Sequence, residues 1–181
     1  MADYRELFVN HFRDREPRAE DLKRIKALSD AWVEVVCDAV KFARAEPGVD
    51  GERVALVGFS LGGCLALAAA ARPELKLAAV VEFFGTLPRE LRPGLGRLPP
   101  ALIFHGEQDE VVPVDEAYAL IGLLATRKLE HEAHVYRDAD HMFATPGGQG
   151  IRQGDYLSAK LATDAFLKKH LRPREAAAAA R

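Results

Sequence analysis

The feature that most limits the fold is the run from Arg53 to Gly63, RVALVGFSLGG, in which a short apolar segment leads directly into glycines around a serine. An apolar segment bounded by Asp50-Gly51 before it and by glycines after it is typical of a buried strand. Helix-forming residues follow from about Leu61 to Ala71. Residues 58–62 therefore match G-x-S-x-G at a turn from a strand into a helix, the context that gives the pattern its meaning.

Ser60 stands at the centre of this pattern. Glycines flank it because a strand that turns sharply into a helix brings backbone segments too close together for side chains. Such a turn holds the serine Oγ out above the sheet, and the helix N-terminus leaves N–H groups unsatisfied. The backbone N–H of Leu61 is therefore expected to donate to an oxyanion that forms at Ser60.

The rest of the chain alternates helical and strand-like patterns. The predicted elements are, in order, a helix over 22–44, a strand over 53–59, a helix over 61–71, strands over 77–84 and 101–105, a helix over 115–127 with Asp115 as its N-cap, a strand over 132–136 and a helix over 155–171. This order predicts an α/β fold with a mostly parallel sheet of about four strands flanked by helices. One domain is expected over 1–172, with an irregular lead-in over 1–20, in which Glu6–Val9 is weakly strand-like, and an Ala-rich tail over 173–181.

A serine hydroxyl is a weak nucleophile that needs a base, and the sequence supplies an acid and a histidine after later strands. Asp109 lies in HGEQDEVVP after the third strand, and His141 lies in YRDADHMF after the fourth. The carboxyl ends of parallel strands share one edge of a sheet, so both loops are expected near Ser60. Alternatives nearby are, for the acid, Glu107, Glu110 and Asp115, and for the base, His105, His131 and His134.

Composition excludes several other classes of protein. The net charge is −2, with 25 basic and 27 acidic side chains, so no strong field favours nucleic acid as a partner. Cys37 and Cys64 lack metal-ligand spacing and are expected to be buried free thiols. The chain lacks a signal-peptide pattern and a membrane-length apolar run, which predicts a cytoplasmic protein without membrane contact. No metal or organic cofactor is expected.

The segments GFSLGG, VVEFFGTLP, PALIFHGEQDEVVP and YRDADHMF, preceded by PGVDGERVALVGFS, together resemble the dienelactone hydrolase family of α/β-hydrolases over roughly residues 30–171. The resemblance implies a Cys-Asp-His triad in members that cleave dienelactones. Here Ser60 stands at the nucleophile position, as in esterase-like relatives, which favours general ester hydrolysis. The resemblance also makes Phe84 a candidate for the wall of a substrate pocket. Phe59, beside the serine, is a second candidate.

The same resemblance implies several strands before the helix at 22–44, and a loop among them that supplies a second oxyanion N–H. The sequence therefore predicts a truncated α/β-hydrolase fold, with one unpaired apolar edge at the strand over 53–59. Such an edge favours aggregation unless something covers it. The chain is then a fragment, has a start assigned too late, or forms a homodimer whose second copy covers the edge.

The favoured function is a serine carboxylesterase that hydrolyses small soluble esters through an acyl-enzyme, with Ser60, His141 and Asp109 as the triad. One alternative is a weakly active or inactive α/β-hydrolase-like binding or scaffold protein. Others are a dienelactone hydrolase, a thioesterase or an acyltransferase, because each of these can use the same acyl-enzyme.

Overall fold

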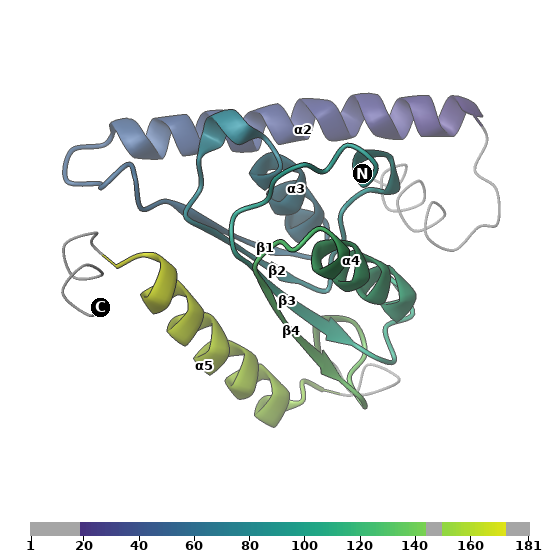
Figure 1. Ribbon diagram of the computed structural model, residues 1–181. Coiled ribbons are helices and arrows are strands. Elements are labelled where there is room, and N and C mark those ends of the chain that lie inside the picture. Colours follow the sequence, from purple (N-terminus) through teal and green to yellow (C-terminus); the bar gives the residue numbers. More distant parts are fainter. Residues whose placement is uncertain (1–18, 144–149, 173–181) are drawn as a thin grey trace.

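The structure is a computed structural model that describes residues 19–143 and 150–172 and forms a three-layer α/β sandwich (Figure 1). The strands are β1 (Ala55–Phe59), β2 (Ala79–Phe83), β3 (Ala101–Gly106) and β4 (His131–Tyr136), in the spatial order β1-β2-β3-β4. Every pair of neighbours is parallel. The predicted parallel sheet of about four strands is confirmed. The weakly strand-like Glu6–Val9 and the Ala-rich tail lie outside the described residues.

Helices cover both faces of this sheet. The helices are α2 (Ala19–Ala45), α3 (Leu61–Ala70), α4 (Val114–Thr126) and α5 (Gln153–His170). One core joins α3 and α4 to the sheet through residues such as Leu67, Ile103 and Leu120, all fully buried. A second core joins α5 to the opposite face, where Phe166 packs with Phe83 and Phe104. β2 and β3 are buried along their whole lengths because both faces and both edges are covered.

α2 forms an outer layer on α3. Val33, Cys37 and Val40 of α2 are buried against Ala68 and Ala69 of α3. The recurrence of apolar residues at Trp32, Val36 and Val40 predicts the packed stripe of this helix. Val40 is buried as expected, but Val33 and Cys37, about a quarter turn from Trp32 and Val36, are the other residues buried there. The small side chains of Ala68 and Ala69 explain this shift, because they let α2 approach α3 closely.

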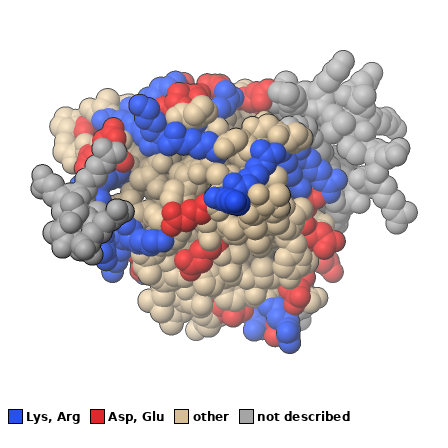
Figure 2. All heavy atoms as spheres, in the orientation of Figure 1, with Lys and Arg blue, Asp and Glu red and all other residues tan. Residues whose placement is uncertain are grey.

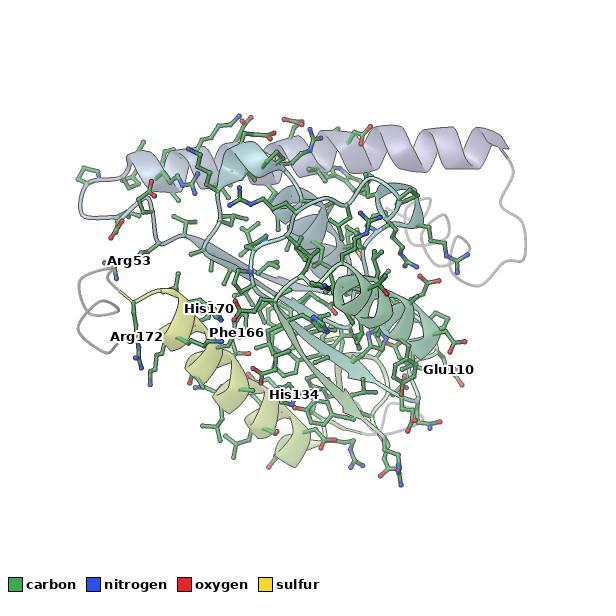
Figure 3. The ribbon with its side chains drawn as sticks, in the orientation of Figure 1. Arg53, Glu110, His134, Phe166, His170 and Arg172 are labelled. Carbon is green, nitrogen blue, oxygen red and sulfur yellow. The ribbon has the colours of Figure 1, made fainter. Side chains whose placement is uncertain are left out.

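The far end of α5 is tied to the segment before β1. The guanidinium of Arg53 donates to the carbonyl of Leu171 over 3.0 Å, and Figure 3 shows Arg53 at that end of the helix. Phe166 and His170 on the same helix have ring centroids 4.4 Å apart. These contacts hold α5 across the sheet face. Asp115, predicted as the N-cap of the fourth helix, instead lies in the first turn of α4, because Pro113 occupies the cap position and its fixed φ is compatible with a helix start.

β1 is an edge strand, so the prediction that it is buried is wrong in part. Val57 and Phe59 are 44% and 54% exposed. Ser60 donates its N–H to the carbonyl of Phe83 on β2. Because backbone groups alternate along a strand, those of Ala55, Val57 and Phe59 point to the opposite side. Within the described part of the chain, no strand pairs with that side.

Candidate active site

The four parallel strands end at one edge of the sheet, and the candidate site residues follow those ends. Ser60 comes directly after β1, Phe84 after β2, Asp109 three residues after β3 and His141 five residues after β4. Loops at this edge are where open α/β sheets place their binding and reacting groups. The fold therefore brings together four segments that are as much as 81 residues apart in sequence.

Ser60 has the strained backbone expected of a strand-to-helix turn, with φ 52° and ψ −120°. Few non-glycine residues adopt a positive φ, and such strain persists only where the surroundings hold it. Here Gly63 donates its N–H to the carbonyl of Ser60 over 2.9 Å. A Cβ on Gly58 would lie 2.1 Å from the carbonyl oxygen of Gly62, so the turn can close only with glycine at position 58.

The Ser60 hydroxyl is joined to His141 and Asp109 by a chain of hydrogen bonds. Nε2 of His141 lies 3.1 Å from Oγ of Ser60, and Nδ1 of the same ring lies 2.8 Å from Oδ2 of Asp109. Both distances are within hydrogen-bond range. A carboxylate beside Nδ1 favours the tautomer that carries the ring proton on Nδ1, which leaves Nε2 as the acceptor for the serine proton.

Backbone donors anchor Asp109 from its other side. Its Oδ1 accepts the N–H groups of Val111 and Val112, each over 2.8 Å. The Asp109 side chain is fully buried, whereas that of His141 is 14% exposed. The carboxylate is therefore held rigidly, and the imidazole that it orients can still be reached from outside.

The alternative histidines lie elsewhere. His105 is buried on β3, and its Nε2 is 2.8 Å from the carbonyl of Val112. Burial lowers the pKa of His105, so the ring is neutral and supports the Asp109 loop from beneath. His131 and His134 are hydrogen-bonded to Leu129 and Glu132, at the opposite end and in the middle of β4.

One aromatic ring packs against the histidine, and a second lies beside the serine. The ring of Phe84 is buried and lies 4.9 Å from the His141 ring, centroid to centroid, at 63°. Phe59 stacks on Phe83 with centroids 4.5 Å apart and remains half exposed beside Ser60. An apolar surface next to a polar reacting group is the usual character of a small-molecule site. The roles of Phe59 and Phe84 as pocket walls stay predictions.

The N-terminus of α3 lies directly after Ser60. Leu61 begins this ten-residue helix, so its N–H has no acceptor within the helix and can bind an anion, assisted by the helix dipole. Sequence reasoning assigned no role to Glu82, a fully buried carboxylic acid under this turn. The signal was a single acidic residue within an otherwise apolar strand.

Other kinds of site find little support in the part of the chain that the structure describes. No cluster of three or more His, Cys, Asp or Glu side chains there could hold a metal ion. None of the helices there is long and apolar enough to cross a bilayer. Figure 2 shows acidic and basic side chains interspersed over the face that it presents. That face therefore offers no large surface of one charge to a polyanion.

Residues 7–171 match the model of the dienelactone hydrolase family. The chain belongs to this family. A carboxymethylenebutenolidase from Pseudomonas putida is 33% identical over 113 residues, which are 62% of this chain and 46% of that protein. An acyl-protein thioesterase 1 homolog from Dictyostelium discoideum is 37% identical over 70 residues, 36% of this chain and 31% of that protein. The chain thus spans less than half the length of these relatives.

Solved structures agree with the α/β-hydrolase fold. A dienelactone hydrolase-like promiscuous phosphotriesterase from metagenomic libraries superposes with a TM-score of 0.72 at 23% identity, covering 88% of this chain and 70% of that one. Esterase 2 of Thermogutta terrifontis, solved phosphorylated by paraoxon, gives a TM-score of 0.61 at 25% identity, covering 78% and 66%. The predicted family resemblance is confirmed.

Proposed function

We propose that this chain is a serine carboxylesterase that hydrolyses small soluble esters, with Ser60 as nucleophile, His141 as base and Asp109 as the orienting acid. The observation that carries the proposal is the continuous hydrogen-bond chain from Asp109 through His141 to Ser60, at a strained strand-to-helix turn. Membership of a family with esterase-like relatives supports the same chemistry.

The reaction follows from this geometry. Nε2 of His141 accepts the Ser60 proton as Oγ attacks the ester carbonyl, and the resulting oxyanion accepts the N–H of Leu61. The imidazolium then protonates the leaving alcohol, which leaves an acyl group on Ser60. Next, His141 takes a proton from water, the hydroxide attacks the acyl carbon, and the returned proton restores the serine hydroxyl. Asp109 remains ionised and stabilises the imidazolium throughout.

The way in which the connector between β2 and β3 is fixed supports the proposal that the substrates are small soluble esters and not lipids. Leu95 and Leu98 of this connector are buried in the core beside α4. The guanidinium of Arg127, which follows α4, donates to the carbonyls of Pro93 and Leu95. A segment fixed to α4 in this way does not resemble the mobile lid of a lipase.

The test is hydrolysis of 4-nitrophenyl acetate by the wild type, by Ser60→Ala and by the control Ser158→Ala. The hydroxyl of Ser158 lies on α5 and accepts a 3.3 Å hydrogen bond from Tyr136. We expect Ser60→Ala to lose activity by about 10³-fold or more, and Ser158→Ala to stay within about twofold of wild type. Equal activity in wild type and Ser60→Ala excludes Ser60 as nucleophile.

A fluorophosphonate probe separates the esterase from an inactive binding protein. Mass spectrometry should locate the label on Ser60 and show that activity is lost in step with labelling, because only an activated serine reacts. A chain that folds but neither labels nor hydrolyses is a binding protein. Parallel assays with a thioester substrate test the thioesterase alternative, which the similarity to the Dictyostelium protein favours.

We also propose that a second copy covers the outer edge of β1, because Val57 and Phe59 are exposed there and no strand among the described residues pairs with that edge. Light scattering coupled to size-exclusion chromatography should show a dimer that Val57→Lys dissociates. A wild-type monomer at all concentrations refutes this arrangement.

A further inference from the structure

Glu82 is an unusual residue for the centre of a sheet. It lies on β2 opposite Gly58 of β1 and Ile103 of β3, and it is fully buried. Glutamate is almost never fully buried unless it is paired. One carboxyl oxygen, Oε2, accepts the N–H of Gly85 over 2.7 Å, whereas Oε1 has no hydrogen-bond partner among the described residues.

The carboxyl group lies directly beneath the turn that carries the nucleophile. A Cβ on Gly85 would lie 3.1 Å from Oε2 of Glu82 and 2.8 Å from the carbonyl oxygen of Ser60. A Cβ on Gly63, in the first turn of α3, would lie 3.3 Å from the same Oε2. Only backbone therefore separates the carboxyl group from the nucleophile turn, and no side chain could be inserted between them.

This environment keeps Glu82 protonated at neutral pH. Burial raises the pKa of Glu82 to about 8, the Gly85 N–H opposes this rise, and the negative charge of Asp109 adds to it. Cys64 of α3 also interacts with this carboxyl, and burial raises its own pKa to about 12, so the thiol is neutral too.

Phe84, directly before Gly85 in this turn, is the residue whose ring contacts His141. Phe84 has a left-handed backbone, with φ 44°, and donates its N–H to the carbonyl of Phe104 over 2.7 Å. A strained aromatic residue needs fixed neighbours on both sides. β3 provides one of them, and the hydrogen bond from Gly85 to Glu82 provides the other. The Phe84 ring then packs edge-on against His141.

We propose that Glu82 is a positioning residue for the reacting groups: its protonated carboxyl holds the amide of Gly85, fixes the strained turn at Phe84 and so keeps the Phe84 ring against His141. This inference rests on the proposed esterase function for its kinetic consequences. It assigns to this chain a pH-dependent control of the triad that is built into β2.

Ionisation of Glu82 disturbs the site in two ways. A carboxylate beneath the first turn of α3 opposes the negative charge that develops on the oxyanion near Leu61. It also draws polar groups or water toward a fully buried position beside the backbone of Gly63 and Gly85, which loosens the turn at Phe84. Activity should therefore fall as the pH rises through about 8, the pKa of Glu82.

The decisive variant is Glu82→Gln, because the amide oxygen still accepts the Gly85 N–H and the side chain no longer titrates. We expect kcat within about threefold of wild type at pH 7, whereas at pH 9 wild type falls about tenfold and Glu82→Gln does not. Glu82→Leu keeps the volume and removes the acceptor, so kcat should fall about tenfold or more at every pH with KM little changed.

The matched control is Glu116→Gln. Glu116 is also buried, on α4, but it pairs with Arg89 and Arg92. Its loss should lower stability and leave the alkaline limb of the kcat profile as in wild type. Rates are normalised to fluorophosphonate-titrated Ser60, so that a change in the folded fraction does not enter the comparison.

An NMR experiment can monitor the contact between Phe84 and His141 in the absence of substrate. The carbon-bound protons of the His141 ring lie against Phe84, so their shifts report ring position. In wild type they should show a transition with a midpoint near pH 8 that persists in Glu116→Gln and is absent in Glu82→Gln.

The proposal is overturned if Glu82→Gln has the wild-type alkaline limb and the wild-type histidine shifts. A wild type that neither hydrolyses esters nor labels at Ser60 refutes the esterase proposal instead. In that case the NMR transition alone decides whether Glu82 positions the ring.

Discussion

Replacing Asp109 by asparagine should separate the geometry of the hydrogen-bond chain from its chemistry. The Asp109 side chain is fully buried and accepts three hydrogen bonds: two at Oδ1, from Val111 and Val112, and one at Oδ2, from His141. An amide in this position has one oxygen and one NH₂ group, so it cannot accept all three.

The two backbone donors decide which way the amide points. If the NH₂ group faced Val111 and Val112, two buried N–H groups would lose their acceptor, at a cost of about 1–3 kcal/mol each. The amide oxygen therefore takes the Oδ1 position, and the NH₂ group faces Nδ1 of His141. The ring must then carry its proton on Nε2, where it can no longer accept the proton of Ser60.

We expect Asp109→Asn to lower kcat by about 10⁴-fold, as a wrong imidazole tautomer does in other serine hydrolases. This loss corresponds to about 5.5 kcal/mol of activation free energy. The thermal midpoint should change little, because both backbone hydrogen bonds survive. The assay is hydrolysis of 4-nitrophenyl acetate, with circular dichroism melts run beside it.

Asp115→Asn is the matched control, because this exposed carboxylate in the first turn of α4 was one of the three sequence alternatives for the acid. It should retain activity within about twofold. If Asp109→Asn keeps more than a tenth of the wild-type kcat while remaining folded, the tautomer argument is wrong and Asp109 does not orient His141.

Three further predictions concern stability and thiol chemistry. Gly58→Ala should destabilise the fold by at least about 1–3 kcal/mol in urea unfolding, because its Cβ would meet the backbone of Gly62 at 2.1 Å; an unchanged midpoint would contradict this close approach. As the pH rises from 4.5 to about 8, the wild type should lose stability relative to Glu82→Gln, by up to about 1.4 kcal/mol per pH unit. The reason is that the raised pKa of Glu82 makes the folded state hold this proton more tightly than the unfolded chain does. Urea midpoints of the two proteins that run parallel across this range would disprove it. Cys37 and Cys64 should resist iodoacetamide at pH 8 in the folded protein and react after denaturation, since burial raises the pKa of both thiols; rapid labelling of native protein would show that one is accessible.

The sheet, and the placement of the three candidate residues at one edge of it, could be predicted from the sequence because each depends on local patterns in a fixed order. Apolar runs closed by glycine marked the strands, and parallel connections place all carboxyl ends at one edge. Ser60, Asp109 and His141 therefore had to come near one another once the strand order was β1-β2-β3-β4. The sequence favoured Asp109 over Glu107, Glu110 and Asp115 but could not give the loop geometry, and the structure places Oδ2 of Asp109 2.8 Å from Nδ1 of His141.

Other features depend on packing that no periodicity records. The stripe on α2 was placed a quarter turn away from Val33 and Cys37, because the approach of one helix to another is set by small residues on the partner. The open edge at β1 was predicted from the family resemblance, whereas the apolar run alone suggested a fully buried strand; the exposure of Val57 shows that burial depends on neighbours in space. Glu82 was visible as an acid among apolar residues, but its meaning depends on the proximity of Gly63 and Gly85.

The nucleophile and the open edge of the sheet lie on the same strand, so stability and reactivity are coupled in this chain. The Ser60 turn is held by Phe83 of β2 on one side, through the Ser60 N–H, and by the first turn of α3 above. Among the described residues, nothing pairs with β1 on its other side. Fraying of β1 would release the strained φ of Ser60 and lengthen its contact with His141 before the central strands open, because edge strands are the first to lose protection. Whatever covers this edge, a second copy or another segment, should therefore raise kcat as well as the free energy of unfolding, and the two effects should appear at the same protein concentration if the cover is a second copy.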